Sequence, residues 1–232
     1  MNRNLLIALA VAAGGLGWAS HANADLITIG FQEAGTNGGA ITPQVPTGSG
    51  AVSVGPVAYG TFTVNQASAQ DTVATGLPTI LNSQSLNVSS AAAGVLHVWI
   101  TAQGLNTPLG LSTFLSTFTN NLLNGSITTA AETTFFDPGN GLFTTTTQLD
   151  TAAFVAPGPQ TIGPLASVPQ NLVAPFSVTE EFTITAVGGG LGNSNLTIDL
   201  AAAAVPEPAS LTLLGSALVG LGWLGRRRRK AV

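Results

Sequence analysis

Alternation of apolar and polar residues, at a period of two, is the feature that most restricts how this chain of 232 residues can fold. Successive residues of a β-strand point to opposite faces, so such a period buries one face of each strand. The alternating segments are rich in Thr, whose β-branched side chain favours strands. Clusters of Gly, Pro and Asn separate them. The pattern predicts an all-β body, folded as an antiparallel β-sandwich or jelly roll.

Seven segments carry the strand prediction. They are Leu26–Phe31, Ala58–Asn65, Gly94–Ala102, Ile127–Phe136, Leu142–Leu149, Pro175–Val187 and Asn195–Leu200. Gly94–Ala102 is apolar on both faces, which predicts a central strand. The turn-forming residues Asp137–Gly141 predict a hairpin between the two strands that flank them. The Gly-rich segment Gly188–Asn193 predicts a loop that joins the last two strands. The order of strand, loop and strand from Pro175 to Leu200 resembles a closing hairpin.

One segment, Gly110–Asn124, has two interpretations. Its large apolar residues recur at helical spacing, at Leu111, Phe114, Leu115, Phe118 and Leu122. Its Ser, Thr and Asn content disfavours a stable helix. A short helix and a non-helical segment both remain open. Thr36–Gly55 and Ala156–Pro175 are punctuated by Pro and Gly, and we expect them to be loops.

The basic residues are confined to the two ends of the chain. Between Asn4 and Gly225 there is no Lys or Arg, while the segment from Asp25 to Val205 contains nine carboxylates. A body without cations has no side chains for phosphate contacts, so we expect no nucleic-acid partner. The chain also has no Cys, which excludes disulfides and thiolate metal sites. A hydrophobic core alone must therefore hold the body together.

Residues 1–24 have the organisation of a signal peptide. Arg3 supplies the positive charge, Leu5–Ala13 the apolar region, and Ala22 and Ala24 the small residues of a cleavage site. Signal peptidase is therefore an expected partner, and cleavage after Ala24 would leave Asp25 as the N-terminus. The alternative, an apolar helix retained in the fold, does not explain why the three features occur in this order.

The other end of the chain is organised as a membrane span. Ala209–Gly225 has no charged residue, and as a helix it would be about 26 Å long, slightly short of the ~30 Å hydrocarbon core of a bilayer. A basic cluster follows at once, made of Arg226, Arg227, Arg228, Arg229 and Lys230. It predicts a stop-transfer signal that keeps the C-terminus in the cytoplasm. An amphipathic surface helix is the alternative, but the segment has no polar face.

The tripeptide Pro206-Glu207-Pro208 stands directly before this span. Tripeptide, apolar span and Arg-rich end together resemble the PEP-CTERM sorting signal, over roughly Val205 to Val232. The resemblance implies that an exosortase, a membrane-embedded protease-like enzyme, recognises and removes the segment. It also implies that the chain comes from a bacterium that produces exopolysaccharide. The chain would be exported through the inner membrane, anchored there transiently, and then located at the cell surface. The predicted domains are a signal peptide (1–24), an exported body (25–204) and the sorting signal (205–232).

Few residues of the body could support catalysis. After signal removal the single His is His97, whose apolar surroundings predict a buried, hydrogen-bonded structural role. Glu180 and Glu181 must point to opposite faces of a strand, and Glu180 then falls on the apolar face. We expect a β-bulge there, with burial of Glu180 as the alternative. Glu132 and Asp150 could approach each other across the predicted hairpin. We assign no catalytic residue, no metal and no cofactor.

The sequence favours an exported structural or adhesive protein of the cell surface or extracellular matrix, associated with biofilm and exopolysaccharide, and not an enzyme. Exposed Thr rows and strand edges could contact polysaccharide or a second copy of the chain. One alternative is a carbohydrate-binding module, which needs exposed aromatic residues. Trp99 and Tyr59 are its candidates for ligand contact, although Trp99 has the surroundings of a core residue. The second alternative is a secreted hydrolase, which would need paired carboxylates in a cleft.

Overall fold

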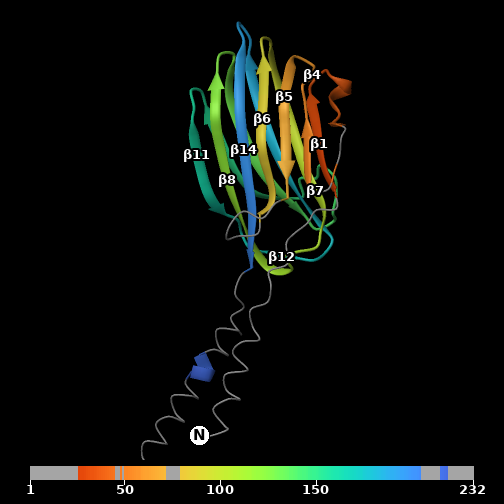
Figure 1. Cartoon of the computed structure of the whole chain (residues 1–232), viewed down its shortest axis with the longest axis vertical. Helices are drawn as coiled ribbons and strands as arrows, with labels where there is room; N and C mark the ends of the chain where they lie inside the picture. The colour runs from red at the N-terminus through yellow and green to blue at the C-terminus, as the bar shows by residue number, and fades with distance from the viewer. Residues whose placement is uncertain (1–25, 45–47, 49, 72–78, 205–214, 219–232) are drawn as a thin grey trace, which may run out of the picture.

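Two antiparallel β-sheets stacked face to face form the body in the computed structural model, which describes residues 26–44, 48, 50–71, 79–204 and 215–218 (Figure 1). This all-β arrangement confirms the predicted sandwich. The predicted signal peptide, the Pro206-Glu207-Pro208 motif and the Arg-rich end lie outside the described residues. Of the predicted membrane span, residues 215–218 are described, and they are helical. No helix within the described ranges is long and apolar enough to cross a membrane.

The two sheets share the strands as follows. Sheet A has the order β10-β9-β13-β7-β1-β2, and sheet B has the order β11-β8-β14-β6-β5-β3, with β12 beside β8 and β4 beside β5. In chain order the elements are β1 (Leu26–Glu33), the 3-10 helix η1 (Asn37–Gly39), β2 (Thr42–Pro43), β3 (Ala51–Val54), β4 (Val57–Tyr59), β5 (Phe62–Gln70), β6 (Thr79–Ser90), β7 (Ala93–Leu105), β8 (Gly110–Asn124), β9 (Ile127–Asp137), β10 (Thr147–Val155), β11 (Gln160–Ala166), β12 (Gln170–Leu172), β13 (Phe176–Val187) and β14 (Gly192–Ala204).

The core lies between the sheets, where alternate residues of each strand meet. On β13, Phe176, Phe182 and Ile184 are fully buried, as a period of two requires. Phe114 of β8 comes from the opposite sheet. The ring of Phe136 on β9 lies 5.7 Å from the ring of Phe114 and 5.8 Å from that of Phe176. Aromatic packing therefore links sheet A to sheet B.

The segment Gly110–Asn124 is one continuous strand, β8, so the helical interpretation is wrong. Phe114 and Phe118 face the core, whereas Leu111 and Leu122, which fitted the helical spacing, are 48% and 38% exposed. β8 pairs with β14 along nearly its whole length. This pairing satisfies the backbone of a segment whose Ser, Thr and Asn residues are poor helix formers.

The chain crosses between the sheets several times, and two of the crossings join β8 to β9 and β13 to β14. β8 of sheet B continues into β9 of sheet A through Gly125, which has a φ of 61°. A Cβ at Gly125 would collide with the Leu191 carbonyl oxygen, so both its conformation and its surroundings require glycine. β13 of sheet A continues into β14 of sheet B. The closing hairpin predicted for these two strands is therefore wrong, because they belong to different sheets.

The other strand predictions hold with shifted boundaries, but the expectation of loops over Thr36–Gly55 and Ala156–Pro175 is wrong in part, because these ranges contain β2, β3, β11 and β12. β9 and β10 pair as the predicted hairpin, but β10 begins at Thr147, because Leu142–Thr146 belongs to a loop. The predicted strand Ala58–Asn65 contains two strands, β4 and β5, that pair with each other. β7 lies between β13 and β1 and is central, as its apolar composition predicts.

Phe182→Ala should lower the free energy of unfolding of the body by about 3–5 kcal/mol. The ring is fully buried and stands between Val98 of β7 and Glu132 of β9, so its removal leaves a cavity between the sheets. Thr185→Ala, on the outer face of the same strand, is the control and should cost well under about 1 kcal/mol. Denaturant titration measures both changes. Equal losses would contradict the assignment of the inner and outer faces of β13.

Candidate functional site

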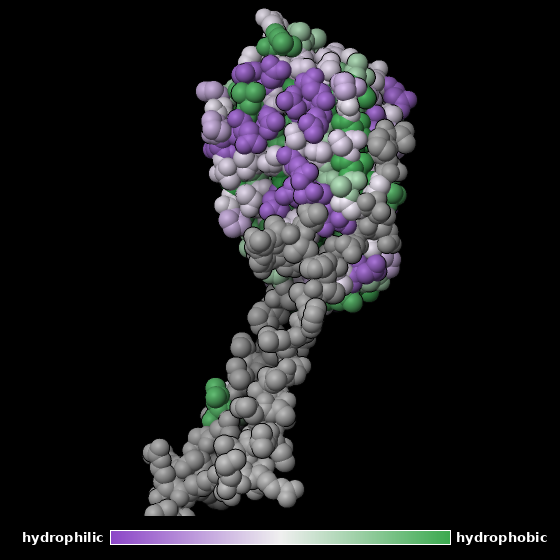
Figure 2. Space-filling model, viewed as in Figure 1, coloured by the Kyte–Doolittle hydropathy of each residue, from purple (hydrophilic) through white to green (hydrophobic). Residues whose placement is uncertain are grey.

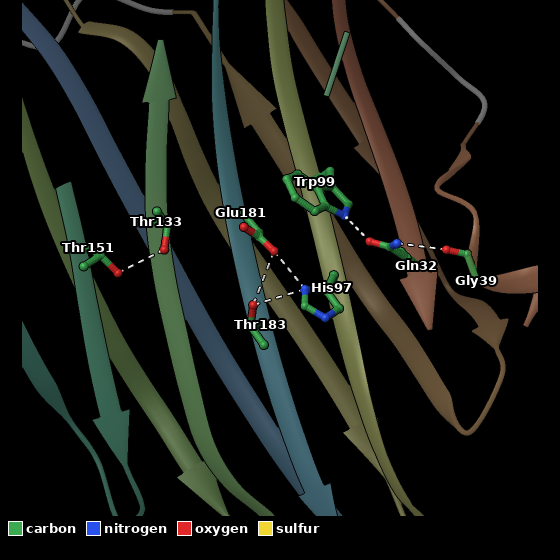
Figure 3. A network of polar contacts seen from close by, with 8 residues as sticks. All are labelled: Gln32, Gly39, His97, Trp99, Thr133, Thr151, Glu181 and Thr183. Atoms are coloured by element: carbon green, nitrogen blue, oxygen red, sulfur yellow. Dashed lines mark hydrogen bonds and ion pairs between the residues drawn. The ribbon is translucent and has the colours of Figure 1, made fainter. Parts of the chain in front are cut away.

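The outer face of sheet A carries a network of polar side chains beside an aromatic ring (Figure 3). We call Gln32, His97, Trp99, Glu181 and Thr183 the sheet A platform. They come from β1, β7 and β13, which are adjacent in the sheet. The register places Glu181 opposite Trp99 and Thr183 opposite His97. Strand alternation and register together therefore gather these side chains on one face.

His97 is hydrogen-bonded as predicted, but it is not buried. Its Nδ1 lies 2.8 Å from Glu181 Oε1 and 3.2 Å from Thr183 Oγ1, and 33% of its side chain is exposed. The prediction of burial is wrong because His97 and Trp99 share the outer face of β7, while Val98 between them fills the core. Since β7 is apolar on both faces, periodicity did not distinguish its inner face from its outer one.

Trp99 is the aromatic member of the platform. Its ring lies nearly parallel to the His97 imidazole, at 16°, with the ring centroids 6.3 Å apart. Its Nε1–H donates to Gln32 Oε1 at 3.2 Å, and Gln32 Nε2 donates in turn to the Gly39 carbonyl at 2.9 Å. The indole is thus held at both its ring face and its polar edge.

Two loops fold over the outer face of sheet A beside Trp99, which is only 8% exposed. Gly30 stands opposite Trp99 in β1, and the side chains of Phe143 and Ile41 lie so close above Gly30 that a Cβ there would clash with both. The backbone N–H of Phe143 donates to Thr101 Oγ1 at 3.2 Å, which holds its loop on the sheet. The open part of the platform is therefore its β13 side.

Tyr59, the second candidate for ligand contact, belongs to the core. It is 8% exposed, its hydroxyl lies 2.8 Å from Thr42 Oγ1, and its ring meets Phe31 edge-on with the centroids 5.7 Å apart. Phe31 faces the core, whereas Trp99 lies on the outside of sheet A. The structure therefore does not bring Trp99 and Tyr59 together, and ligand contact by either residue stays a prediction.

Glu180 is fully buried on the inner face of β13. It pairs in unbroken register with Ile100 on one side and Thr134 on the other, so the β-bulge expected at this position is wrong and the alternative of burial holds. Its neighbour Glu181 lies on the outer face, as the strand period predicts. The two carboxylates are on opposite sides of sheet A.

Glu132 of β9 is a second carboxylate enclosed in the core. It is fully buried and stands opposite Phe182, two residues along β13 from Glu180, on the same inner face. No carboxylate oxygen of Glu132 or Glu180 has a hydrogen-bond partner of good geometry among the described residues. The hydroxyl of Ser83, which faces Glu180 from β6, is engaged with the backbone of Ile198. The two carboxylates are therefore buried without a well-formed hydrogen bond among the described residues.

Burial is the main cause that raises the pKa of both groups. It raises the pKa of Glu132 to about 9, with a further rise from the charge of Glu180 and a lowering by the nearby Thr119 backbone. Burial likewise raises the pKa of Glu180 well above its usual value; Ser83 lowers it and the charge of Asp199 raises it. Both carboxyls keep their protons at a pH where an exposed Glu has lost its own.

Asp150 extends this polar layer to the edge strand β10. It pairs with Thr134, two residues from Glu132, so Glu132 and Asp150 do lie on neighbouring strands, as the predicted hairpin allows. Ser116 of sheet B links the group, with its Oγ 3.2 Å from Asp150 Oδ2 and 3.0 Å from Thr134 Oγ1. Burial raises the pKa of Asp150, although the Ser116 hydrogen bond opposes the rise. The carboxylates form a layer between sheets, and no cleft opens onto Glu132 or Glu180, which are fully buried.

Comparison with known families confirms the sorting signal. Residues 204–229 match the PEP-CTERM protein-sorting motif. The match includes Pro206, Glu207 and Pro208 together with all four Arg residues of the basic cluster, although these residues lie outside the described ranges. The chain therefore carries a PEP-CTERM signal, which implies export, processing by an exosortase at the membrane, and a surface location. No curated protein matches the chain.

Solved structures similar to this chain include carbohydrate-binding modules and an adhesin domain. TmCBM61, solved with β-1,4-galactotriose, is 9% identical with a TM-score of 0.30, over 52% of this chain and 70% of that chain. A CBM4 structure is 13% identical with a TM-score of 0.29, over 67% and 95%. The adhesin domain of Epf from Streptococcus pyogenes is 9% identical with a TM-score of 0.28, over 67% and 59%. Likeness at this level assigns this chain neither a fold family nor a ligand.

The folded body should lose stability as the pH rises from about 5 to about 9. Below the ordinary pKa of 4.5 both the folded and the unfolded chain hold the Glu132 proton. Above it the unfolded chain releases the proton while the folded core retains it, so unfolding becomes progressively easier until the folded pKa is reached.

Glu132→Gln keeps the shape of the side chain and removes its titration, so it should make this fall smaller and leave the part that comes from Glu180. Thr185→Ala, on the outer face of β13, changes no titratable group and should leave the fall as it is in the unmodified chain. Thermal melting followed by circular dichroism across this pH range measures all three proteins. An unchanged fall in Glu132→Gln would show that this residue is not its source.

Proposed function

We propose that the protein is an exported structural or adhesive component of the cell surface or extracellular matrix, and that it is not an enzyme. The observation that carries the proposal is the direct succession of sandwich and sorting motif. β14 ends at Ala204, the residue at which the motif match begins. The sorting signal therefore delivers the sandwich itself, and the function of the mature protein resides in the surface of that sandwich.

Both outer faces of the sandwich present hydroxyl and amide side chains. Beyond the platform on sheet A, the hydroxyls of Thr133 and Thr151 lie 3.0 Å apart. On sheet B, Asn65 donates to Asn87 at 2.9 Å, and Asn121 donates to Asn195 across β8 and β14 at 3.1 Å. Figure 2 shows hydrophilic residues across this face. Such groups offer uncharged donors and acceptors to a sugar hydroxyl or to a second copy of the chain.

The charge of the body favours a neutral partner over an anionic one. Nine carboxylates and no Lys or Arg lie between Asp25 and Val205. Anionic polymers would be repelled, and no side chain could form an ion pair with their acidic groups. A neutral polysaccharide or the protein itself fits this surface.

The described surface also supports a non-enzymatic role. The paired carboxylates Glu132 and Glu180 are enclosed between the sheets, where no substrate reaches them. A shallow depression over β3, β5 and β6 is lined by Ala, Val, Ser and Gln side chains, with no acid or base in its lining. A glycoside hydrolase of the common type needs its two carboxylates on either side of a bound sugar in an open cleft.

Glu207→Ala should block processing without unfolding the body, because the tripeptide follows the last strand. The precursor should stay in the membrane fraction at a mass about 2–3 kDa above that of the processed form, by the length of the sorting segment. Ser210→Ala, just outside the tripeptide, is the matched control and should be processed normally. Cell fractionation with mass spectrometry measures each form. Release of Glu207→Ala at the processed mass would refute sorting through this motif.

A second function, glycan binding at the sheet A platform, is favoured by the polar groups beside the Trp99 ring. His97→Ala and Glu181→Gln should each weaken retention of the body in gels that contain the neutral exopolysaccharide, because they remove partners on the open side. Tyr59→Phe, which removes one hydroxyl in the core, is the control and should migrate like the unmodified body. Equal retention of all variants would exclude the platform as the binding site.

A further inference from the structure

The described chain enters and leaves the sandwich at the same end, which we call the basal end. β1 begins there, with Leu26 opposite Gln103 near the end of β7. β14 finishes there, with Ala204 opposite Ser112 near the start of β8. The short connection from β7 to β8 joins these two places, and both lie at the lower end of the sandwich in Figure 1. The sorting segment therefore leaves from the basal end.

Four large aliphatic residues stand exposed on the loops and strand ends around this exit. Leu109, Leu111, Val168 and Val173 are 56%, 48%, 77% and 62% exposed. We call them the basal rim. Leu111 is one residue from Ser112, the partner of Ala204, and is paired with Asn171 of β12. Val168 and Val173 lie just before and just after β12. The rim thus borders the point at which β14 ends.

The length of the tether limits how far the basal end can lie from the bilayer. Four residues, Val205 to Pro208, separate β14 from the uncharged span that begins at Ala209. Fully extended, they reach about 12–14 Å, while the polar region of a bilayer is roughly 5–7 Å thick on each side of the hydrocarbon core. The span is slightly shorter than the hydrocarbon core. This mismatch pulls the tether residues toward the hydrocarbon and so shortens the distance between the body and the bilayer.

The opposite end of the sandwich cannot contact the bilayer at the same time as the basal end. Val187, at the far end of β13, is 61% exposed, which is comparable to Val173. β13 contains twelve residues, so its two ends are about 40 Å apart at roughly 3.3 Å per residue. Apolar exposure alone therefore does not identify the membrane side; the tether does.

We propose that the basal rim rests on the outer surface of the bilayer that holds the sorting segment, before that segment is removed. The partner is lipid, and the contact is apolar: no Lys or Arg lies between Asn4 and Gly225 to attract anionic headgroups. The contact therefore forms with zwitterionic lipid and persists at high salt. The inference rests on the sorting function proposed above, because it requires the span to be inserted.

Labelling of single cysteines tests the proposal, since the chain has no Cys of its own. Val173→Cys and Val187→Cys are matched in exposure and lie at opposite ends of the body. Each full-length chain is labelled with an environment-sensitive fluorophore and reconstituted, without exosortase, into phosphatidylcholine vesicles that carry a quencher in the lipid. Fluorescence at position 173 should fall several-fold more than at position 187, and it should do so equally at low and high salt.

The other outcomes overturn the proposal in distinguishable ways. Flotation with the vesicles but no quenching at position 173 would show an inserted span with the rim away from lipid. Shielding of position 173 only after exosortase is added would identify that enzyme as the partner of the rim. Failure to float with the vesicles would refute insertion as well, whereas processing through Glu207 is measured separately in cells.

Discussion

A carboxylate that folds inward in this body can be neutralised only by a proton, because no Lys or Arg lies between Asn4 and Gly225. Glu132 and Glu180 are both in that position, enclosed where sheet A meets sheet B. An unpaired charge in such a place costs several kcal/mol or more. The close packing of the two sheets, with Phe182 beside both acids, therefore depends on the retention of two protons. In a body without disulfides, the same apolar contacts also carry the whole stability of the fold.

The buried acids also fix the register of the central strands. A one-residue slip of β13 would turn Glu181 inward and remove Glu180 from the neighbourhood of Glu132. It would equally break the contact of Glu181 with His97, at 2.8 Å on the outer face. Adjacent glutamates on one strand thus have separate roles. One belongs to the neutral layer between the sheets, and the other orients the imidazole of the platform.

Sequence reasoning succeeded where the two faces of a strand differ in polarity, as they do around Phe182 and Thr183. It failed where the two faces of a strand have similar polarity. β7 is apolar on both sides, so His97 was assigned to the wrong face; β8 carries Ser116 on its core side, bonded to Thr134 of the opposite sheet. Ser116 and Thr134 lie on consecutive strands of opposite sheets, and the platform residues lie on β1, β7 and β13, so both groups can be found only once the strand order is known. The bulge expected at Glu180 rested on the cost of a charged Glu, and a protonated one does not incur it.

The basal end has a consequence for how many copies of this protein would stand together. The long strands of the sandwich run between that end and the turns at Gly60, Gly125 and Gly188, which form the opposite end. Molecules that are all anchored by a short segment at the same end would be oriented in parallel, with their long axes pointing away from the membrane. Neighbours then meet side to side, sheet face against sheet face, and the glycine turns are the part that the surroundings encounter first. Until the sorting segment is removed, the tether would therefore set the orientation in which the Thr- and Asn-lined faces meet a partner.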